Sequence, residues 1–314
     1  MANDSLIHAV TGAFGYSGKY ITRLLLSRGI GVRALTNSPD RNTEFQGKVQ
    51  AFPLDFDDHE GLVASLNGCE VLYNTYWVRF NHRRFTQARA VENTYRLFAA
   101  AREAGVHRVV HVSITNPSAD SPYEYFSSKA AMEKKLVDSG QSYAILRPAV
   151  LFGGADILIN NIAWALRRFP IMGVFGRGDY RIQPIHVEDF ARLAVEQGSL
   201  RDDVIINATG PECFTYRELL STVAAIIGKK RLIVPVPRFL GWAVAWLVGR
   251  FVRDVVLTRQ EIGALCDDLL WADSPPSGTT KLTEWACARR DTLGMTYANE
   301  MTRRIDRKQS YEKL

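Results

Sequence analysis

A tyrosine and a lysine four positions apart, Tyr125 and Lys129, form the most specific chemical pattern in this sequence. On a helix this spacing puts both side chains on one face. A phenol, whose ordinary pKa is about 10, exchanges protons near neutral pH only when that pKa is lowered. The Lys129 ammonium would favour the phenolate by charge attraction, and it can also bind ribose hydroxyls. The pair is a candidate for acid–base catalysis at an oxygen atom.

Ser113 is a third candidate, because it directly follows the apolar run Arg108–Val112 and lies twelve residues before Tyr125. A hydroxyl at a strand end can donate to a carbonyl or accept from an alcohol. The Tyr-x-x-x-Lys spacing alone is frequent by chance, and an exposed helix pair is its structural alternative. The serine before it favours the catalytic interpretation.

Three glycines at a spacing of three, Gly12, Gly15 and Gly18, follow an apolar run at residues 6–10. They would permit a tight turn, a close approach of the backbone to a pyrophosphate, and close packing of the next helix. The N–H groups that begin that helix suit phosphates. Such a pattern also occurs in turns without ligands, but its place after a first strand favours a dinucleotide site.

The end of the second apolar run indicates which nucleotide is bound, because a carboxylate there binds the ribose of NAD and a basic residue suits the 2′-phosphate of NADP. This sequence has Thr36 and Asn37 at that point, with Arg41 or Arg33 able to add positive charge. NADP(H) is therefore favoured over NAD(H), although Asp40 leaves a ribose contact open. After the third run, Asp55 and Phe56 can hold the edge and the face of an adenine ring.

Short apolar runs alternate with helix-length segments as far as residue 148, which predicts an α/β fold with a doubly wound parallel sheet. The expected strands are 6–10, 31–35, 49–52, 71–75, 108–112 and 143–146. The expected helices between them are 17–28, 59–67, 86–104 and 127–139. Later helices are expected at 157–168, 216–227, 239–253 and 259–270, with β-rich returns at 181–186 and 204–207. We expect a dinucleotide-binding domain at 1–152, completed by about 181–208, and a smaller, mostly helical substrate region at 153–180 and 209–314.

Composition is that of a globular protein, with 46% hydrophobic residues and a net charge of +6 spread along 314 residues. Nucleic-acid binding is not expected, and the basic residues of 303–308 are expected in a frayed tail. Four distant cysteines without metal-ligand spacing predict core thiols and no metal site. No secretory pattern is visible at the start, so a cytoplasmic location is expected.

The chain resembles short-chain dehydrogenases/reductases of the extended or atypical type, in the branch of NAD-dependent epimerase/dehydratase-like proteins related to the NDUFA9-type subunit of complex I. The matching segments are 11–18, Asp55, Asn93, Ser113, Tyr125-x-x-x-Lys129, Arg147-Pro148 and 186–189. The resemblance implies that Ser113, Tyr125 and Lys129 form a catalytic triad, that Pro148 lies near the nicotinamide and that Asn93 braces the fourth helix. Further cofactor contacts implied by it are Phe14, Tyr16, Thr75 and Tyr76.

The chain departs from the family after the fourth strand, where Tyr76 and Trp77 replace small residues. These aromatic side chains either line the substrate pocket or fill a gap in the core. Arg177 and Arg181 are candidate substrate-phosphate contacts, with a plain loop as the alternative. In the segment 186–189, His186 is expected to be a buried hydrogen-bonded residue and the two acids to begin a helix.

The uncharged run 239–249, bracketed by arginines, is shorter than the about twenty residues that a membrane span needs. Core packing or a dimer interface is the favoured role, with a membrane interface or the cap of an apolar pocket as alternatives. Together these features predict an NAD(P)-dependent oxidoreductase that acts on a small-molecule carbonyl or alcohol, with an apolar substrate favoured and with Tyr125 as acid/base. A sugar-nucleotide epimerase/dehydratase and a non-catalytic NADP(H)-binding subunit or redox sensor are the alternatives.

Overall fold

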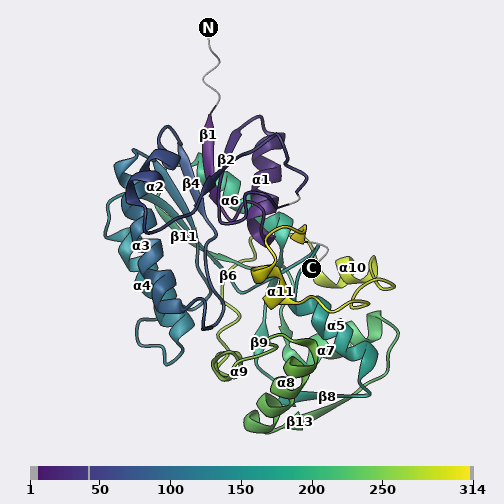
Figure 1. Cartoon of the computed structure of the whole chain (residues 1–314). Coiled ribbons are helices and arrows are strands. Elements are labelled where there is room, and N and C mark those ends of the chain that lie inside the picture. Colours follow the sequence, from purple (N-terminus) through teal and green to yellow (C-terminus); the bar gives the residue numbers. More distant parts are fainter. Residues whose placement is uncertain (1–5, 42, 312–314) are drawn as a thin grey trace. The chain divides into compact units, whose positions relative to one another are not determined.

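The computed structural model describes residues 6–41 and 43–311 (Figure 1). By packing, the chain divides into two compact units. Unit 1 comprises residues 1–147, 191–206 and 307–313, and unit 2 comprises essentially 148–190 and 207–306. These units are defined by packing alone, so the domain boundaries expected from the sequence stay a prediction.

A seven-stranded sheet forms the centre of unit 1, in the order β11-β6-β5-β4-β1-β2-β3. The strands from β3 across to β6 run parallel to their neighbours. Their bounds are β1 Ile7–Thr11, β2 Gly31–Thr36, β3 Gln50–Pro53, β4 Val71–Asn74, β5 Arg108–Val112, β6 Ser142–Pro148 and β11 Val204–Ala208. This order confirms the doubly wound α/β fold predicted from the sequence.

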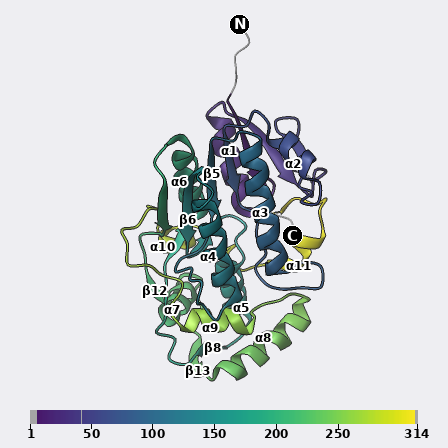
Figure 2. The same ribbon diagram turned by 90° about the vertical axis from the view of Figure 1, so that its left-hand side faces the viewer.

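Helices cover both faces of this sheet, as Figures 1 and 2 show. Helices α2, α3 and α4 lie side by side on one face, and α1 and α6 lie on the other. The bounds are α1 Tyr16–Ser27, α2 His59–Leu66, α3 Gln87–Glu103, α4 Glu124–Val137 and α6 Val187–Ser199. All four residues of β4 are buried, as expected for a strand covered on both faces.

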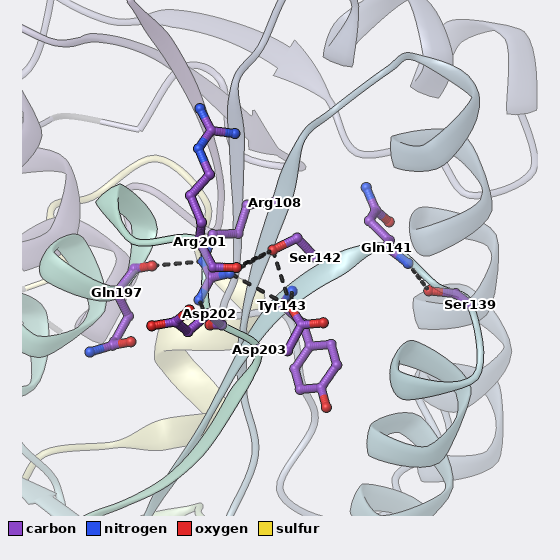
Figure 3. Close-up of polar contacts among 9 residues, drawn as sticks. All are labelled: Arg108, Ser139, Gln141, Ser142, Tyr143, Gln197, Arg201, Asp202 and Asp203. Carbon is purple, nitrogen blue, oxygen red and sulfur yellow. Dashed lines mark hydrogen bonds and ion pairs between the residues drawn. The ribbon is translucent and has the colours of Figure 1, made fainter.

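A buried arginine fixes the edge of the sheet at β11 (Figure 3). Arg108, at the start of β5 and 3% exposed, donates to the carbonyl oxygens of Gln197 and Asp202, each at 2.7 Å. The carboxylate of Asp203 accepts from the hydroxyl of Ser142 at 3.1 Å and from the Tyr143 amide at 2.8 Å. These bonds join the end of α6 to the strands β5 and β6.

Unit 2 contains three two-stranded sheets, β10-β7, β12-β9 and β13-β8, packed with helices around a second core. The strands are β7 Val150–Phe152, β8 Ile171–Phe175, β9 Arg181–Ile182, β10 Pro184–His186, β12 Phe214–Thr215 and β13 Leu232–Val236. The helices are α5 Leu158–Arg168, α7 Tyr216–Ile226, α8 Arg238–Val252, α9 Arg259–Cys266, α10 Leu282–Cys287 and α11 Glu300–Ile305.

Most predicted elements end within two residues of the observed bounds, and three differences concern the candidate site or its neighbours. Helix α4 begins at Glu124, three residues before the predicted start, so Tyr125 lies in its first turn. The predicted β return at 181–186 is two short strands, and α9 ends at Cys266 rather than 270. The expectation of a frayed tail is wrong for Arg303 and Arg304, because both lie in α11 and Arg304 pairs with Glu300 at 2.6 Å.

Candidate active site

The turn between β1 and α1 has the geometry that the three glycines predict. Gly12 adopts a φ of +62°, which favours glycine, and its N–H donates to Leu35. A Cβ at Gly18 would lie 2.8 Å from the carbonyl carbon of Gly12 and closer still to its oxygen. Gly15, the N-cap of α1, offers no side chain to cap the helix. The start of α1 can therefore accept a pyrophosphate.

The side chains beside these glycines have different surroundings. Phe14 is 6% exposed and its ring stacks on Phe45, with 6.4 Å between centroids, so its backbone and not its ring faces the turn. The ring of Tyr16 stacks on Tyr311 with 6.3 Å between centroids. The C-terminal segment therefore lies beside the predicted pyrophosphate site, a placement that the sequence did not predict.

The loop after β2 is also bonded to that C-terminal segment. Arg307 donates to the carbonyl oxygen of Asn37 at 3.1 Å, and Arg41 donates to that of Gln309 at 3.3 Å. Thr36 accepts a bond from Ser38 at 3.0 Å through its hydroxyl, which shapes the turn. The predicted residues Thr36, Asn37 and Arg41 thus lie together, and Arg307 joins them.

Arg33, the alternative source of positive charge in this loop, has a structural role. Its guanidinium donates to the carbonyl oxygens of Ser65 and Asn67, at 3.2 and 2.6 Å. These oxygens belong to the C-terminal end of α2, where a cation stabilises the helix dipole. Arg33 therefore serves the packing of α2.

The segment after β4 is held against the end of β1. The hydroxyl of Thr11 accepts the amide N–H groups of Thr75 and Tyr76, at 2.8 and 3.1 Å. The ring of Tyr76 lies against Phe56, with 4.7 Å between centroids, and its hydroxyl accepts a bond from Asn93 at 2.9 Å. Asn93 lies in α3 and braces Tyr76, which corrects the role in a fourth helix that the resemblance implied.

Asp55, the predicted partner of an adenine edge, closes the turn before α2. Its carboxylate accepts the N–H of Asp57 at 3.0 Å. Asp58 is the N-cap of α2, as predicted, and accepts from Gly61 at 2.9 Å. Asp57 pairs with Arg96 and Arg89, at 2.5 and 3.2 Å.

Ser113, Tyr125 and Lys129 all lie where β5 ends and α4 begins. The amide of Ser113 donates to Leu146 at 2.7 Å, which extends the β5–β6 ladder. The Ser113 hydroxyl is buried and has no hydrogen-bond partner among the described residues. Lys129 lies one turn after Tyr125, with 5.9 Å between its ammonium and the phenol ring centroid. Ser113, Tyr125 and Lys129 thus lie together at the carboxyl end of β5.

Trp77 contacts both members of the tyrosine–lysine pair. Its ring meets that of Tyr125 edge-on, with 5.5 Å between centroids. The Lys129 ammonium lies 4.5 Å from the Trp77 ring centroid and donates to Val112 at 2.8 Å. A cation over an indole face is attracted by the ring quadrupole, most strongly away from water. Trp77, predicted only as a substrate or core residue, is therefore a direct neighbour of the candidate catalytic pair.

Burial sets the protonation of Lys129. The side chain is 2% exposed, and burial lowers its pKa to about 7, while the carboxylate of Glu133 partly opposes that shift. Arg147 holds Glu133 through two hydrogen bonds, one of them 2.9 Å long. His111 lies in β5, next to this site, and burial followed by the charge of Lys129 holds its pKa well below the ordinary value. A lysine with this pKa can exchange protons near neutrality.

The remaining predicted residues lie at other points of the fold. Pro148 is the last residue of β6. In unit 2, Arg177 is exposed in the loop after β8, while Arg181 is bonded to Asp268 and lies over the ring of Trp271. Arg181 is thus held by its own unit.

The histidine and acids of 186–189 have the structural roles that were expected. Helix α6 begins at Val187, and Asp189 accepts the N–H groups of Thr279 and Thr280, at 2.8 and 2.7 Å. His186 is buried and its ring contacts Phe152, with 5.1 Å between centroids. Within residues 6–41 and 43–311, no group of three or more metal-ligating side chains could hold an ion.

Comparisons with known proteins agree with this geometry. Residues 12–159 match the model of a protein family described as NAD(P)H-binding. Over 293 residues the chain is 26% identical to mitochondrial NADH dehydrogenase (ubiquinone) 1 alpha subcomplex subunit 9 of Arabidopsis thaliana. The aligned region covers 86% of this chain and 72% of that relative.

Solved structures share the fold at lower identity. An NADPH-dependent quinone oxidoreductase of Escherichia coli, complexed with NADPH, has a TM-score of 0.74 at 20% identity, covering 90% of this chain and 99% of that one. A nucleoside-diphosphate-sugar epimerase of Staphylococcus aureus has a TM-score of 0.73 at 18% identity, with 90% and 99% covered. Both likenesses show the Rossmann-type fold.

We predict that Gly18→Ala destabilises the protein, because the new Cβ would collide with the Gly12 carbonyl. Overpacking of this kind costs about 1–3 kcal/mol. The measurement is the urea midpoint of unfolding. Gly31→Ala is the matched control, since its Cβ would meet the nearest atom at an ordinary 3.5 Å. Equal midpoints for the two variants would contradict the tight packing of α1 on the turn.

A second prediction concerns the pH dependence of stability. Because the pKa of Lys129 falls from 10.5 unfolded to about 7 folded, the unfolded chain binds more protons between these values. The free energy of unfolding should therefore rise with pH from about 7 to about 10.5, by on the order of 5 kcal/mol from this group. Lys129→Met should remove that rise in urea unfolding measured across the range.

Lys134→Met, at a side chain that is 76% exposed, is the control and should keep the wild-type slope. The wild type and Lys129→Met share every other group that titrates in this range, and Lys134→Met shows the effect of removing an exposed lysine, so the comparison isolates the buried Lys129. An unchanged slope in Lys129→Met would show that the ammonium is not buried.

Proposed function

Residues 12–159 match the model of an NAD(P)H-binding family, and on that premise we propose that the chain is an NADP(H)-dependent reductase of an apolar carbonyl compound. The observation that carries this proposal is the buried Lys129 one turn after Tyr125, beside a buried Ser113 hydroxyl that has no partner among the described residues. The Ser113 hydroxyl can therefore donate a hydrogen bond to a substrate oxygen.

The residues of unit 1 fit a dinucleotide. Gly12 has a positive φ, and any Cβ at Gly18 would make a close contact. Only backbone atoms therefore stand at the start of α1, where the pyrophosphate would bind. When bound, the nicotinamide supplies or accepts the hydride at the substrate carbon. Lys129 would bind its ribose, and Phe56 with Tyr76 would form an aromatic wall for the adenosine end.

The chain's own groups handle the substrate oxygen. In the direction of reduction, the phenol of Tyr125 gives its proton to the carbonyl oxygen as the carbon gains the hydride. Ser113 donates a hydrogen bond to that oxygen. The charged form of Lys129 stabilises the resulting phenolate, and its pKa of about 7 lets it pass a proton back.

An apolar substrate is favoured by the aromatic surroundings of the pair. Trp77 packs against both Tyr125 and Lys129, so an aromatic side chain borders the candidate catalytic pair. The quinone oxidoreductase that shares the fold is named for an apolar carbonyl substrate. An epimerase of sugar nucleotides has less support, because Arg181 is already bonded to Asp268. The cytoplasmic location expected from the sequence stays a prediction.

A non-catalytic NADP(H)-binding subunit is the second candidate. The observation that favours it is the position of Trp77, whose ring covers the Lys129 ammonium. The similarity to a subunit of NADH dehydrogenase is consistent with such a role. In that case the protein would bind nucleotide with no turnover of any carbonyl compound.

Tyr125→Phe tests the catalytic proposal. Removing the proton donor should lower turnover of a quinone or aromatic ketone with NADPH by about 100-fold or more, because general acid catalysis contributes that much. The measurement is NADPH oxidation followed by absorbance, with NADPH affinity measured in parallel. Tyr123→Phe, two residues earlier, is the control and should keep activity. Unchanged turnover in Tyr125→Phe would refute the role of Tyr125.

Arg307→Ala tests the preference for NADP(H). Arg307 bonds to the loop that holds Asn37, where a 2′-phosphate would lie, and a charge-assisted bond to phosphate is stronger than a neutral one. We expect the Kd of NADPH to rise about tenfold, equivalent to about 1.4 kcal/mol, and that of NADH to change little. The measurement is fluorescence titration. Arg201→Ala, at a side chain 84% exposed, is the control. Equal losses for both nucleotides would contradict the preference.

A further inference from the structure

Helix α8 of unit 2 presents large apolar side chains to solvent along most of its length. The exposed fractions are 74% for Phe239, 54% for Val244, 57% for Trp246, 64% for Leu247 and 85% for Phe251. Of its fifteen residues, only Gly249 is buried. The core-packing role favoured from the sequence is therefore wrong for this outward face.

The opposite face of α8 is already in use within unit 2. A Cβ at Gly241 would collide with the ring of Phe175, so this glycine lets the helix pack closely on β8. Trp242 packs against the core of unit 2, and Arg259 lies over its ring at 4.1 Å. The exposed side chains are therefore held outward by a helix that is fixed on its inner face.

The sequence around α8 is basic, and Asp254, the first acid after it, accepts the N–H groups of Glu300 and Met301. Residues 229–253 contain the six basic residues Lys229, Lys230, Arg231, Arg238, Arg250 and Arg253, and no Asp or Glu. Arg231 bonds to the carbonyl oxygen of Leu166, and Arg238 lies 3.5 Å from Asp267. The other four have no ion-pair partner in the described part of the chain, and all four are exposed.

We propose that α8 docks this protein on an anionic membrane surface, lying in the plane of the interface. An apolar helical face with tryptophan, flanked by free lysine and arginine side chains, has the composition of interfacial helices. A helix of fifteen residues is about 22 Å long, and no helix of the described chain is long and apolar enough to cross a bilayer. The helix therefore lies on the membrane rather than through it.

Charge argues against a second copy of the chain as the occupant of this face. A two-fold symmetric contact places the same patch of each copy against its equal. Two copies meeting through α8 would gather the basic side chains of both 229–253 segments, with no acid of that segment to pair with them. Anionic lipid headgroups supply the opposite charge instead.

Vesicle flotation of the full-length protein tests the proposal. Vesicles of equal parts phosphatidylcholine and phosphatidylglycerol should carry the protein at low salt, and vesicles of phosphatidylcholine alone should bind about tenfold less. Binding should also fall as salt is raised. The double variant Val244→Glu, Leu247→Glu should lose about tenfold or more in binding, because it puts two negative charges on the apolar face.

Leu200→Glu is the matched control, since Leu200 is a 50% exposed leucine of unit 1, and it should bind like wild type. The molar mass in solution, from light scattering, is measured for every variant. Absence of binding to anionic vesicles at low salt would overturn the proposal, as would equal binding by the double variant. If the wild type is a dimer and the double variant is a monomer, the face binds a second copy of the chain, and the proposal is likewise overturned. None of these results depends on nucleotide binding.

Discussion

The candidate site depends on the hydrogen bonds of the Thr11 hydroxyl. It donates to Asn74 at 3.1 Å while accepting the amides of Thr75 and Tyr76. Asn74 in turn contacts His111 at 3.1 Å, so one buried network joins the ends of β1, β4 and β5. Buried polar groups are costly unless each finds a partner, so the three strand ends are held in one register. The turn of Gly12, the aromatic segment after β4 and Ser113 all start from these ends.

Lys129 is the residue of this site whose charged form is most disfavoured by burial. Its ammonium is removed from water and contacts one carbonyl oxygen and one indole face, which lowers its pKa to about 7. The carboxylate of Glu133, which is bonded to Arg147, only partly offsets the effect of burial on the pKa of Lys129. A site that keeps a lysine close to neutrality is suited to proton exchange, and the same burial makes the fold sensitive to pH.

Unit 2 leaves part of its apolar surface exposed to solvent. Its core is closed by α5, α7 and the small sheets, yet α8 leaves Phe239, Leu247 and Phe251 in water. A folded chain exposes a continuous apolar face of this kind where it meets another phase or another molecule. The proposed reduction rests on residues of unit 1 and the proposed membrane attachment on residues of unit 2, so each proposal can be tested without the other.

The sequence by itself determined the alternation of strands and helices, the glycine turn and the positions of Ser113, Tyr125 and Lys129, because these follow from local periodicity and fixed spacing. It did not determine that Trp77 covers Lys129, since that contact joins the segment after β4 to helix α4, which are far apart in the chain. Nor did it show that Arg307 returns to the loop of Asn37, or that α8 remains uncovered. Local patterns decide which faces are apolar, but only tertiary packing decides which of those faces find a partner.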